Sequence, residues 1–301
     1  DRSGSVIQRN GAEEIQQTWS RFVEYLRPRL AELAKSQGEG LAVLAESSSS
    51  PTLLALRTRF QKMYPQARWC EYEPISRDNE REGAKLAFGQ PVRTHLALDK
   101  ARVIVCLDAD PLGMHPAAVR NARDFSRGRD PAAGPMNRLY VIEPTFTITG
   151  SVTDHRLPMR ASDVAWCAKA LHAAVLKGAG SETHEVGKTS TPDMKKAPDP
   201  LAFLAAMAKD LKANGPNTAV VAGPRQPPEV HALVHEINAA LGNVGTAVSY
   251  TAVPDPDRPS HADAIRALCA AMNERRVQTL IVLGGNPVYT APADCRFAEA
   301  M

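Results

Sequence analysis

Two short loops contain the residues of this sequence whose types and spacing best suit ligand binding. In GGNP, Gly284 and Gly285 let the backbone approach a phosphate or a flat ring closely, and the amide of Asn286 can donate and accept hydrogen bonds. In EPT, which runs from Glu143 to Thr145, the carboxylate could hold a ribose hydroxyl or the edge of a guanine base. A tight turn explains GGNP equally well, and a solvated strand end is the simpler interpretation of Glu143.

A third loop, DADP at 108–111, also follows an apolar run and aligns with GGNP. Asp108 and Asp110 stand here in the places of Gly284 and Asn286. Two carboxylates facing a pyrophosphate would repel it at a cost well above that of a lost hydrogen bond. We therefore expect this loop to bind no anionic cofactor.

Other polar clusters have simpler structural explanations. The serine run at 47–50 precedes an expected helix and could hold an anion, but capping by Ser50 ahead of Pro51 explains it better. His231 and His235 form an i, i+4 pair on another expected helix. Because HALVH has no Glu between the two histidines, we interpret them as helix surface rather than as zinc ligands.

The five cysteines are too widely spaced to form a recognisable metal motif. No CxxC pair occurs, so the spacing that wraps a zinc ion or an iron–sulfur cluster is absent. GxSxG, GxxxxGK[ST] and GxGxxG are absent as well. No catalytic residue and no metal ligand is therefore assigned, and we expect Cys106, Cys167 and Cys269 to be buried apolar side chains.

Apolar periodicity predicts alternating helices and strands along the chain. The polar and charged stretch at 76–90 is interpreted as a surface excursion. Strands are expected at 41–45, 68–72, 103–107, 138–144, 218–223, 246–250 and 279–283, and helices at 15–30, after Pro51, near Pro116, from Ser162 or Asp163, and at about 200–213, 228–241 and 261–274.

Two segments of the first part of the chain align without gaps on two segments of the second part. LAVLAESSSSP at 41–51 aligns with TAVVAGPRQPP at 218–228, and CLDADPLGMHP at 106–116 aligns with VLGGNPVYTAP at 282–292. The near-equal offsets predict an α/β protein of two Rossmann-like parallel-sheet halves, with helices on both faces, related by an internal pseudo-repeat. The expected domains are residues 1–185, a linker rich in Pro, Ser, Thr and Lys at 186–200, and residues 201–301, truncated at the C-terminus.

Length and charge exclude several protein classes. The chain has 301 residues, 44% of them hydrophobic, and a net charge of +3 with both signs interspersed, which argues against nucleic acid as a partner. The longest uncharged run, 237–254, contains Asn238, Asn243 and Ser249, so we expect no direct membrane span. The chain starts at Asp1 without an apolar signal core, and we expect an excised piece of a longer protein that is soluble as a fragment.

The order and spacing of the strand-loop segments resemble those of the molybdopterin oxidoreductases. The segments are VIVCLDADPLGMHP, RLYVIEPTFTITG, TAVVAGPRQPPEV and TLIVLGGNPVYTAP. The family usually has Gly-x-Asn-Pro in the first loop and Asp-Pro-Arg at a later strand end, where this chain has DADP and EPT. With these departures it is most similar to the molybdopterin-like and iron–sulfur subunit of alternative complex III, a bacterial quinol to cytochrome c oxidoreductase.

This resemblance implies a scaffold fragment of a respiratory iron–sulfur electron-transfer subunit on the periplasmic side of a bacterial inner membrane. No cofactor is expected in the fragment, and iron–sulfur clusters are expected only elsewhere in the parent chain. The implied partners are that chain's iron–sulfur domain and the cytochrome and membrane quinol-oxidising subunits.

Two alternatives remain open. The chain could belong to an active enzyme that binds molybdopterin guanine dinucleotide, with its metal ligand outside the fragment. The resemblance would then assign cofactor contacts to Gly284, Gly285, Asn286, Glu143 and Thr145. The chain could also be a small-ligand binder that uses a cleft between the halves.

Overall fold

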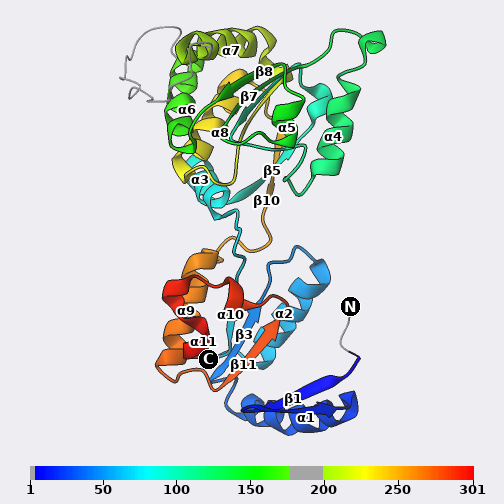
Figure 1. The fold of residues 1–301 in the computed structure, drawn as a ribbon, viewed down its shortest axis with the longest axis vertical. Coiled ribbons are helices and arrows are strands. Elements are labelled where there is room, and N and C mark those ends of the chain that lie inside the picture. Colours follow the sequence, from blue (N-terminus) through cyan, green and yellow to red (C-terminus); the bar gives the residue numbers. More distant parts are fainter. Residues whose placement is uncertain (1–3, 177–198) are drawn as a thin grey trace. The chain divides into compact units, whose positions relative to one another are not determined.

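The structure is a computed structural model that describes residues 4–176 and 199–301. The chain divides into two compact units (Figure 1). Unit 1 consists of residues 1–75 and 258–301, and unit 2 consists of residues 76–257. Each unit has a parallel sheet flanked by helices, so the predicted α/β class is confirmed.

Unit 1 is built on a three-stranded parallel sheet in the order β11-β3-β4. The middle strand is buried along its whole length, because alternate residues of LAVLA face opposite helical layers. Ala42 and Leu44 pack into one core cluster and Leu41 into another. The strands are β3 (Leu41–Ala45), β4 (Arg68–Glu71) and β11 (Thr279–Leu283), and a separate antiparallel hairpin joins β1 (Val6–Asn10) to β2 (Glu13–Gln17).

Helices cover both faces of the unit 1 sheet (Figure 1). On one face, Ile265 and Leu268 of α9 pack against Leu44. On the other, Phe60 of α2 and Leu33 of α1 pack with Leu41. The helices are α1 (Trp19–Lys35), α2 (Pro51–Met63), α9 (His261–Asn273), α10 (Pro287–Thr290) and α11 (Phe297–Ala300).

Unit 2 contains a four-stranded parallel sheet in the order β8-β7-β6-β9. Val103, Val105 and Leu107 face one core cluster, whereas Ile104 and Cys106 face the other. The strands are β6 (Val103–Leu107), β7 (Arg138–Glu143), β8 (His155–Pro158) and β9 (Thr218–Ala222), and β5 (Val92–Leu96) pairs antiparallel with β10 (Val248–Ala252).

Three long helices cover one face of this sheet, and α4 lies on the other (Figure 1). Leu171 of α6, Met207 of α7 and Ile237 of α8 are fully buried in the first cluster, and Phe125 of α4 packs into the second. The helices of unit 2 are α3 (Asp78–Phe88), α4 (Ala118–Arg127), α5 (Ile148–Ser151), α6 (Ala161–Leu176), α7 (Pro200–Asn214) and α8 (Pro228–Leu241).

The units do not follow the expected boundaries at 186–200. β9 lies beyond that stretch in sequence, yet it pairs with β6, so residues on both sides of the expected linker form one sheet. β11 belongs to the expected second domain but pairs with β3. Neither half of the sequence can complete its sheet without strands from the other. Residues 177–198, which hold most of the expected linker, lie outside the described residues.

The stretch at 76–90, expected to be a surface excursion, forms α3 instead. Its contact with α8 is close because Gly83 has no side chain: a Cβ at Gly83 would lie 2.3 Å from Cβ of His231. As a result His231 and His235 are 5% and 8% exposed, so their interpretation as helix surface was wrong.

Several local predictions are confirmed. Ser50 caps α2, since the Leu53 N–H donates to its Oγ at 3.4 Å. The strand ends at 45, 107 and 283 match the expected ones. Cys106, Cys167 and Cys269 are buried free thiols, as expected.

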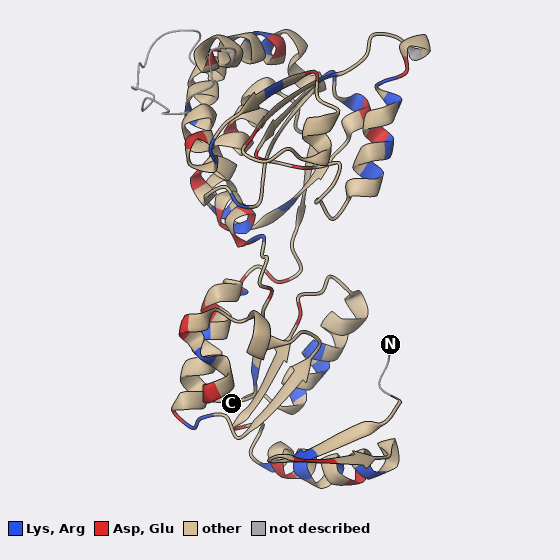
Figure 2. Cartoon of the chain, viewed as in Figure 1, with Lys and Arg blue, Asp and Glu red and all other residues tan. Residues whose placement is uncertain are grey.

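The expected helix at 15–30 starts later, at Trp19 with Thr18 as its cap, because Ile15 belongs to β2. No helix in residues 4–176 and 199–301 is long and apolar enough to cross a membrane. Figure 2 shows Lys, Arg, Asp and Glu distributed over the helices of each unit.

We predict that residues 76–257 fold on their own, whereas residues 1–185 do not form a complete unit. The first fragment keeps the β6–β9 pairing and both core clusters, but the second lacks β9 and α8. Circular dichroism should show one cooperative thermal transition for 76–257. Cooperative unfolding of 1–185 with no transition for 76–257 would contradict these unit boundaries.

Candidate functional site

The carboxyl ends of parallel strands meet at one edge of the unit 2 sheet. The loops 108–111, 144–147 and 223–226 follow β6, β7 and β9 there and are called the unit 2 edge. Ligands of open parallel sheets usually bind at this edge. It contains Asp108, Asp110 and Thr145, which the sequence singled out, and Glu143 is the last residue of β7 beside it.

Asp108 links the loop after β6 to the loop after β9. Its φ of 54° lies in the left-handed region, which costs a non-glycine residue about 1–2 kcal/mol. Its carboxylate accepts hydrogen bonds from Arg225 Nη2 at 2.8 Å and Gln226 Nε2 at 2.9 Å. Because the Asp108 side chain is only 1% exposed, its charge needs these partners. The carboxylate therefore lies against the protein, not toward a ligand.

Asp110 is also fully engaged within unit 2. One carboxylate oxygen accepts from the Thr149 N–H at 3.0 Å and the Thr149 hydroxyl at 2.6 Å, and the other accepts from the Met114 N–H at 3.1 Å. These bonds join the loop 108–111 to α5. Hydrogen bonds to a charged acceptor are among the stronger ones, so three donors fix the carboxylate in this position.

Glu143 is neither a solvated strand end nor a free ligand-binding group. It is fully buried, and its carboxylate accepts from Arg156 Nε at 2.7 Å and from the Thr147 hydroxyl at 2.6 Å. Arg156 also lies over the ring of Phe146, with 4.8 Å between the guanidinium carbon and the ring centre. The expected solvated end was therefore wrong, because β8 supplies an arginine beside β7. Thr145 is exposed in the same loop.

Glycines of unit 2 pack directly against these acidic groups. A Cβ at Gly223 would lie 1.7 Å from the carbonyl oxygen of Asp108. At Gly150 it would lie 1.9 Å from Glu143 Oε1, and at Gly113 2.3 Å from Asp110 Oδ2. Glycine can make room for a ligand, but here the chain's own oxygens fill that room. The unit 2 edge is thus closed by its own loops.

The other predicted residues lie at the carboxyl edge of the unit 1 sheet. Gly284 and Gly285 have φ values of 78° and 68°, and Asn286 O accepts the N–H groups of Tyr289 and Thr290 at the start of α10. The loop is therefore a tight turn that leads into a helix, as one interpretation predicted. Glu46, which follows β3, places Oε2 2.6 Å from where a Cβ of Gly284 would stand.

The candidate residues fall into two groups in different units. Gly284, Gly285 and Asn286 form one turn of unit 1, and Glu143 and Thr145 lie in unit 2. Sequence reasoning missed the partners that decide the character of both edges. These partners are Glu46, Arg156, Arg225 and Gln226. Their positions beside the candidate residues can be predicted only when the strand order is known.

Three histidines line a cavity of about 50 Å³ in unit 2. Burial is the main cause that lowers the pKa of His115, His231 and His235, each to about 4. His235 Nδ1 lies 3.1 Å from the Tyr250 hydroxyl, whereas His231 Nε2 has no hydrogen-bond partner among the described residues. Within those same residues, no group of three or more His, Cys, Asp or Glu is arranged to hold a metal ion.

Comparisons with known proteins found similar solved structures but no matching family or curated protein. No protein-family model matches the sequence, and no curated protein matches it. Acetylene hydratase from Pelobacter acetylenicus is similar in structure, with a TM-score of 0.66 and 12% identity over 98% of this chain and 50% of that chain. The formyltransferase/hydrolase complex FhcABCD from Methylorubrum extorquens gives a TM-score of 0.47 and 18% identity over 78% of this chain and 58% of that chain.

The chain spans about half the length of acetylene hydratase. At 12% identity this likeness concerns the fold alone. The chain has the fold of about half of acetylene hydratase.

We predict that Gly223→Ala strongly destabilises the chain. A methyl group at this position would overlap the Asp108 carbonyl, and the loops after β6 and β9 would have to separate. We expect a loss of about 3 kcal/mol in the free energy of unfolding, at the upper end for overpacking. Urea denaturation measures it.

The matched control is Gly242→Ala. Gly242 has a φ of 69° with no atom within 4 Å of its Cβ position, so only backbone strain opposes the alanine. That strain should cost about 1–2 kcal/mol. Equal losses at the two glycines would contradict a closed unit 2 edge.

We also predict that the chain loses stability in mild acid. The pKa values of about 4 for His115, His231 and His235 lie below the ordinary 6.5, so the unfolded chain binds more protons between these pH values. The free energy of unfolding is therefore highest above pH 6.5 and falls as the pH decreases toward 4. At pH 5 we expect a loss on the order of 1–2 kcal/mol per buried imidazole.

Urea denaturation at several pH values measures this dependence. The double variant His231→Gln, His235→Gln should flatten it, because it removes two of the three imidazoles whose pKa values are lowered. A slope that the double variant does not alter would contradict the assignment.

Proposed function

We propose that this chain is a molybdopterin-oxidoreductase-like scaffold of a respiratory iron–sulfur electron-transfer subunit, without a molybdenum cofactor of its own. The fold shared with acetylene hydratase over 98% of the chain supports the structural part of this proposal. The observation that carries the functional part is the closed unit 2 edge. There Asp108, Asp110 and Glu143 are held by the chain's own donors.

The residues present do not fit the pyrophosphate of a pterin dinucleotide at the unit 2 edge. A pyrophosphate needs free cations or unpaired N–H groups, but Arg225 and Arg156 already neutralise Asp108 and Glu143. The space over Gly223 is filled by backbone. A bound dianion would have to break these buried ion pairs, and breaking one by removing a partner typically costs about 3–5 kcal/mol.

The unit 1 edge is more open but carries its own obstacle. Gly284 and Gly285 present an exposed turn, which favours the alternative of an active enzyme that binds the dinucleotide. Glu46, however, places a carboxylate beside this turn and would repel a phosphate. Its oxygens suit a hydroxyl or amine donor better.

In the proposed role the chain positions other redox groups and does no chemistry itself. The expected partners are the iron–sulfur domain of the parent chain and cytochrome and quinol-oxidising membrane subunits, on the periplasmic side of a bacterial inner membrane. This part of the proposal rests on the sequence resemblance alone.

The internal pseudo-repeat is also retained as a proposal. The aligned segments 41–51 and 218–228 each form a buried strand followed by a helix whose first residue is Pro. The segments 106–116 and 282–292 each contain the end of a parallel strand and a turn. Because β3 pairs with β11 and β6 with β9, each sheet would combine one strand from each copy.

Metal and pterin analysis of the parent protein tests the proposal. The protein is produced in a host that makes the cofactor, beside a known molybdenum enzyme, and molybdenum, tungsten and released pterin fluorescence are measured. We expect metal and pterin far below one per chain, and an unchanged result for Asn286→Ala.

Molybdenum near one per chain would overturn the proposal in favour of the alternative. In that case Asn286→Ala should lower the metal and pterin content, since Asn286 lies in the turn that the alternative assigns to the cofactor.

A further inference from the structure

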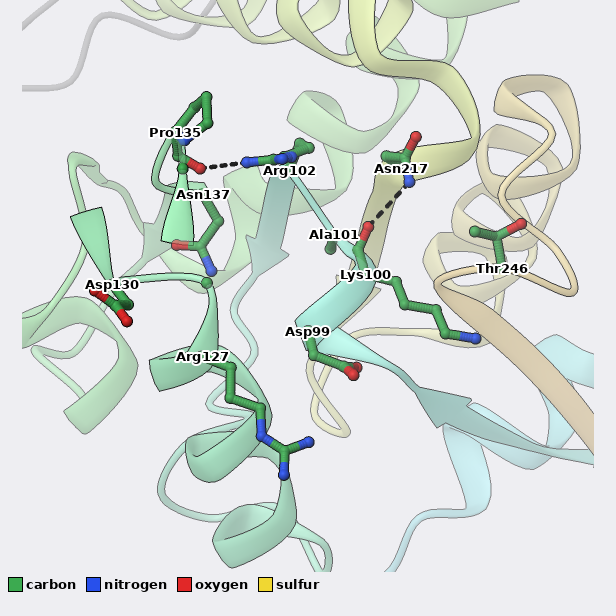
Figure 3. A pocket seen from close by; sticks show the side chains of 12 residues that line it. Asp99, Lys100, Ala101, Arg102, Arg127, Asp130, Pro135, Asn137, Asn217 and Thr246 are labelled. Atoms are coloured by element: carbon green, nitrogen blue, oxygen red, sulfur yellow. Dashed lines mark hydrogen bonds between the residues drawn. The ribbon is translucent and has the colours of Figure 1, made fainter. Parts of the chain in front are cut away.

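A polar pocket of about 360 Å³ lies at the opposite end of the unit 2 sheet (Figure 3). Its wall includes Arg102, Asn137 and Asn217, which directly precede β6, β7 and β9. The pocket is therefore at the amino ends of the strands, away from the unit 2 edge. Its volume is within the range of roughly 300–1,000 Å³ that small-molecule sites occupy.

Three cations line this pocket, namely Lys100, Arg102 and Arg127. The ammonium group of Lys100 makes no ion pair or hydrogen bond within residues 4–176 and 199–301. Arg102 donates through Nη1 to the Pro135 carbonyl, which holds its guanidinium at the pocket wall (Figure 3). Lys and Arg side chains placed in this way bind phosphate.

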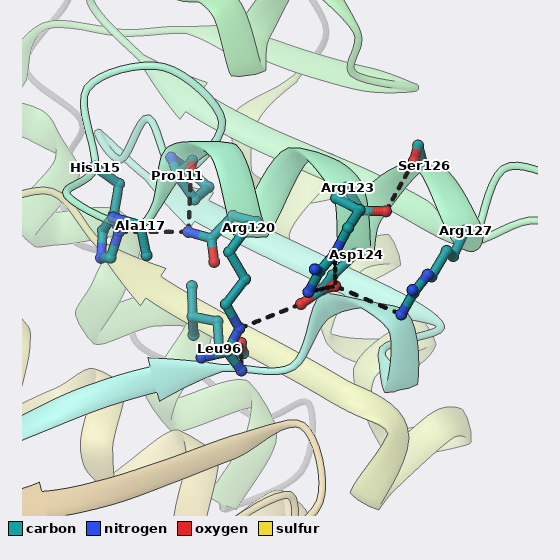
Figure 4. Close-up of polar contacts among 10 residues, drawn as sticks. Leu96, Pro111, His115, Ala117, Arg120, Arg123, Asp124, Ser126 and Arg127 are labelled. Atoms are coloured by element: carbon teal, nitrogen blue, oxygen red, sulfur yellow. Dashed lines mark hydrogen bonds and ion pairs between the residues drawn. The ribbon is translucent and has the colours of Figure 1, made fainter.

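A cluster on α4 adds to the positive charge beside the pocket (Figure 4). Asp124 is 4% exposed, and its carboxylate oxygens form ion pairs with three guanidinium groups. The N–O distances are 3.0 Å for Arg123, 3.4 Å for Arg120 and 3.8 Å for Arg127. Three guanidinium groups share this one carboxylate, so two positive charges remain uncompensated within the cluster. Arg127 belongs to both the cluster and the pocket wall, and its long contact with Asp124 leaves it able to bind an anion.

Acceptor groups line the same pocket. The carboxylates of Asp99 and Asp130 would repel a ligand whose groups are all anionic. They can accept hydrogen bonds from the hydroxyl groups of a ligand. Asn137 is 4% exposed and donates through Nδ2 to the Phe125 carbonyl at 3.3 Å. Its Oδ1 has no partner among the described residues, and a buried acceptor of this kind favours a donor beside it.

We propose that this pocket binds a small phosphorylated polyol, with the phosphate held by cations of the pocket wall and the hydroxyl groups by its carboxylates. Cations alone would suit any anion, and carboxylates alone would suit a sugar. The two together select a ligand that carries both groups. The site does not depend on the proposed scaffold role, because it shares no residue with either carboxyl edge.

Isothermal titration of the purified chain with ribose 5-phosphate, inorganic phosphate and ribose, at matched ionic strength, tests the proposal. We expect saturable binding of ribose 5-phosphate, weaker by about tenfold or more for phosphate or ribose alone, since each loses charge-assisted hydrogen bonds. The affinity should fall as salt is added. Equal affinity for phosphate and ribose 5-phosphate would overturn the polyol assignment.

Variants locate the site. Lys100→Gln and Arg127→Met should each weaken ribose 5-phosphate binding about tenfold. Asp130→Asn, which keeps an acceptor for the Ala132 N–H, should weaken ribose 5-phosphate binding and leave phosphate binding unchanged. The control Lys209→Gln removes an exposed charge on α7 outside the pocket and should have no effect.

Thermal unfolding of each variant shows that it is folded. The same loss of affinity in Lys209→Gln, or no saturable binding of any of the three probes by the wild-type chain, would overturn the proposal.

Discussion

Unit 2 depends on the pairing of one strand, β6, on both of its edges. All five residues of β6 are between 0% and 2% exposed, so water cannot satisfy their N–H and C=O groups. β7 supplies partners on one edge and β9 on the other. Because β9 comes from beyond residue 198, the chain has to return to the same sheet. This requirement places β6 and β9 in one unit.

The same pairing decides the chemistry at the carboxyl edge. Once β6 and β9 are neighbours, the residue after one strand meets the loop after the other, and Asp108 finds Arg225 and Gln226. β7 and β8 repeat the arrangement with Glu143 and Arg156. An acidic residue at a strand end is therefore ambiguous in sequence. Its charge takes on a structural meaning only when the neighbouring strand or the loop after it supplies an arginine.

The predictable elements are those with strong local signals. Strands at 41–45, 103–107 and 279–283 are apolar runs that end at polar or glycine residues, and Ser50 marks a helix start by its capping geometry. α3 had no such signal, because its contact with α8 runs through Gly83 and Ala84 rather than through large apolar side chains. The tight turn at GGNP was predictable from its two glycines. Glu46, Arg156 and Arg225 were not, because strand order is a long-range property.

The insertion of unit 2 within unit 1 also orders the events of synthesis. A ribosome completes every residue of unit 2 before it makes β11, the strand that pairs with β3. Domains generally fold as units while the chain emerges. The nascent β3 therefore lacks one of its two neighbouring strands until β11 has been synthesised. If unit 2 has folded by then, the entropy cost of bringing β11 to β3 is lower, because a compact insert replaces a long flexible loop.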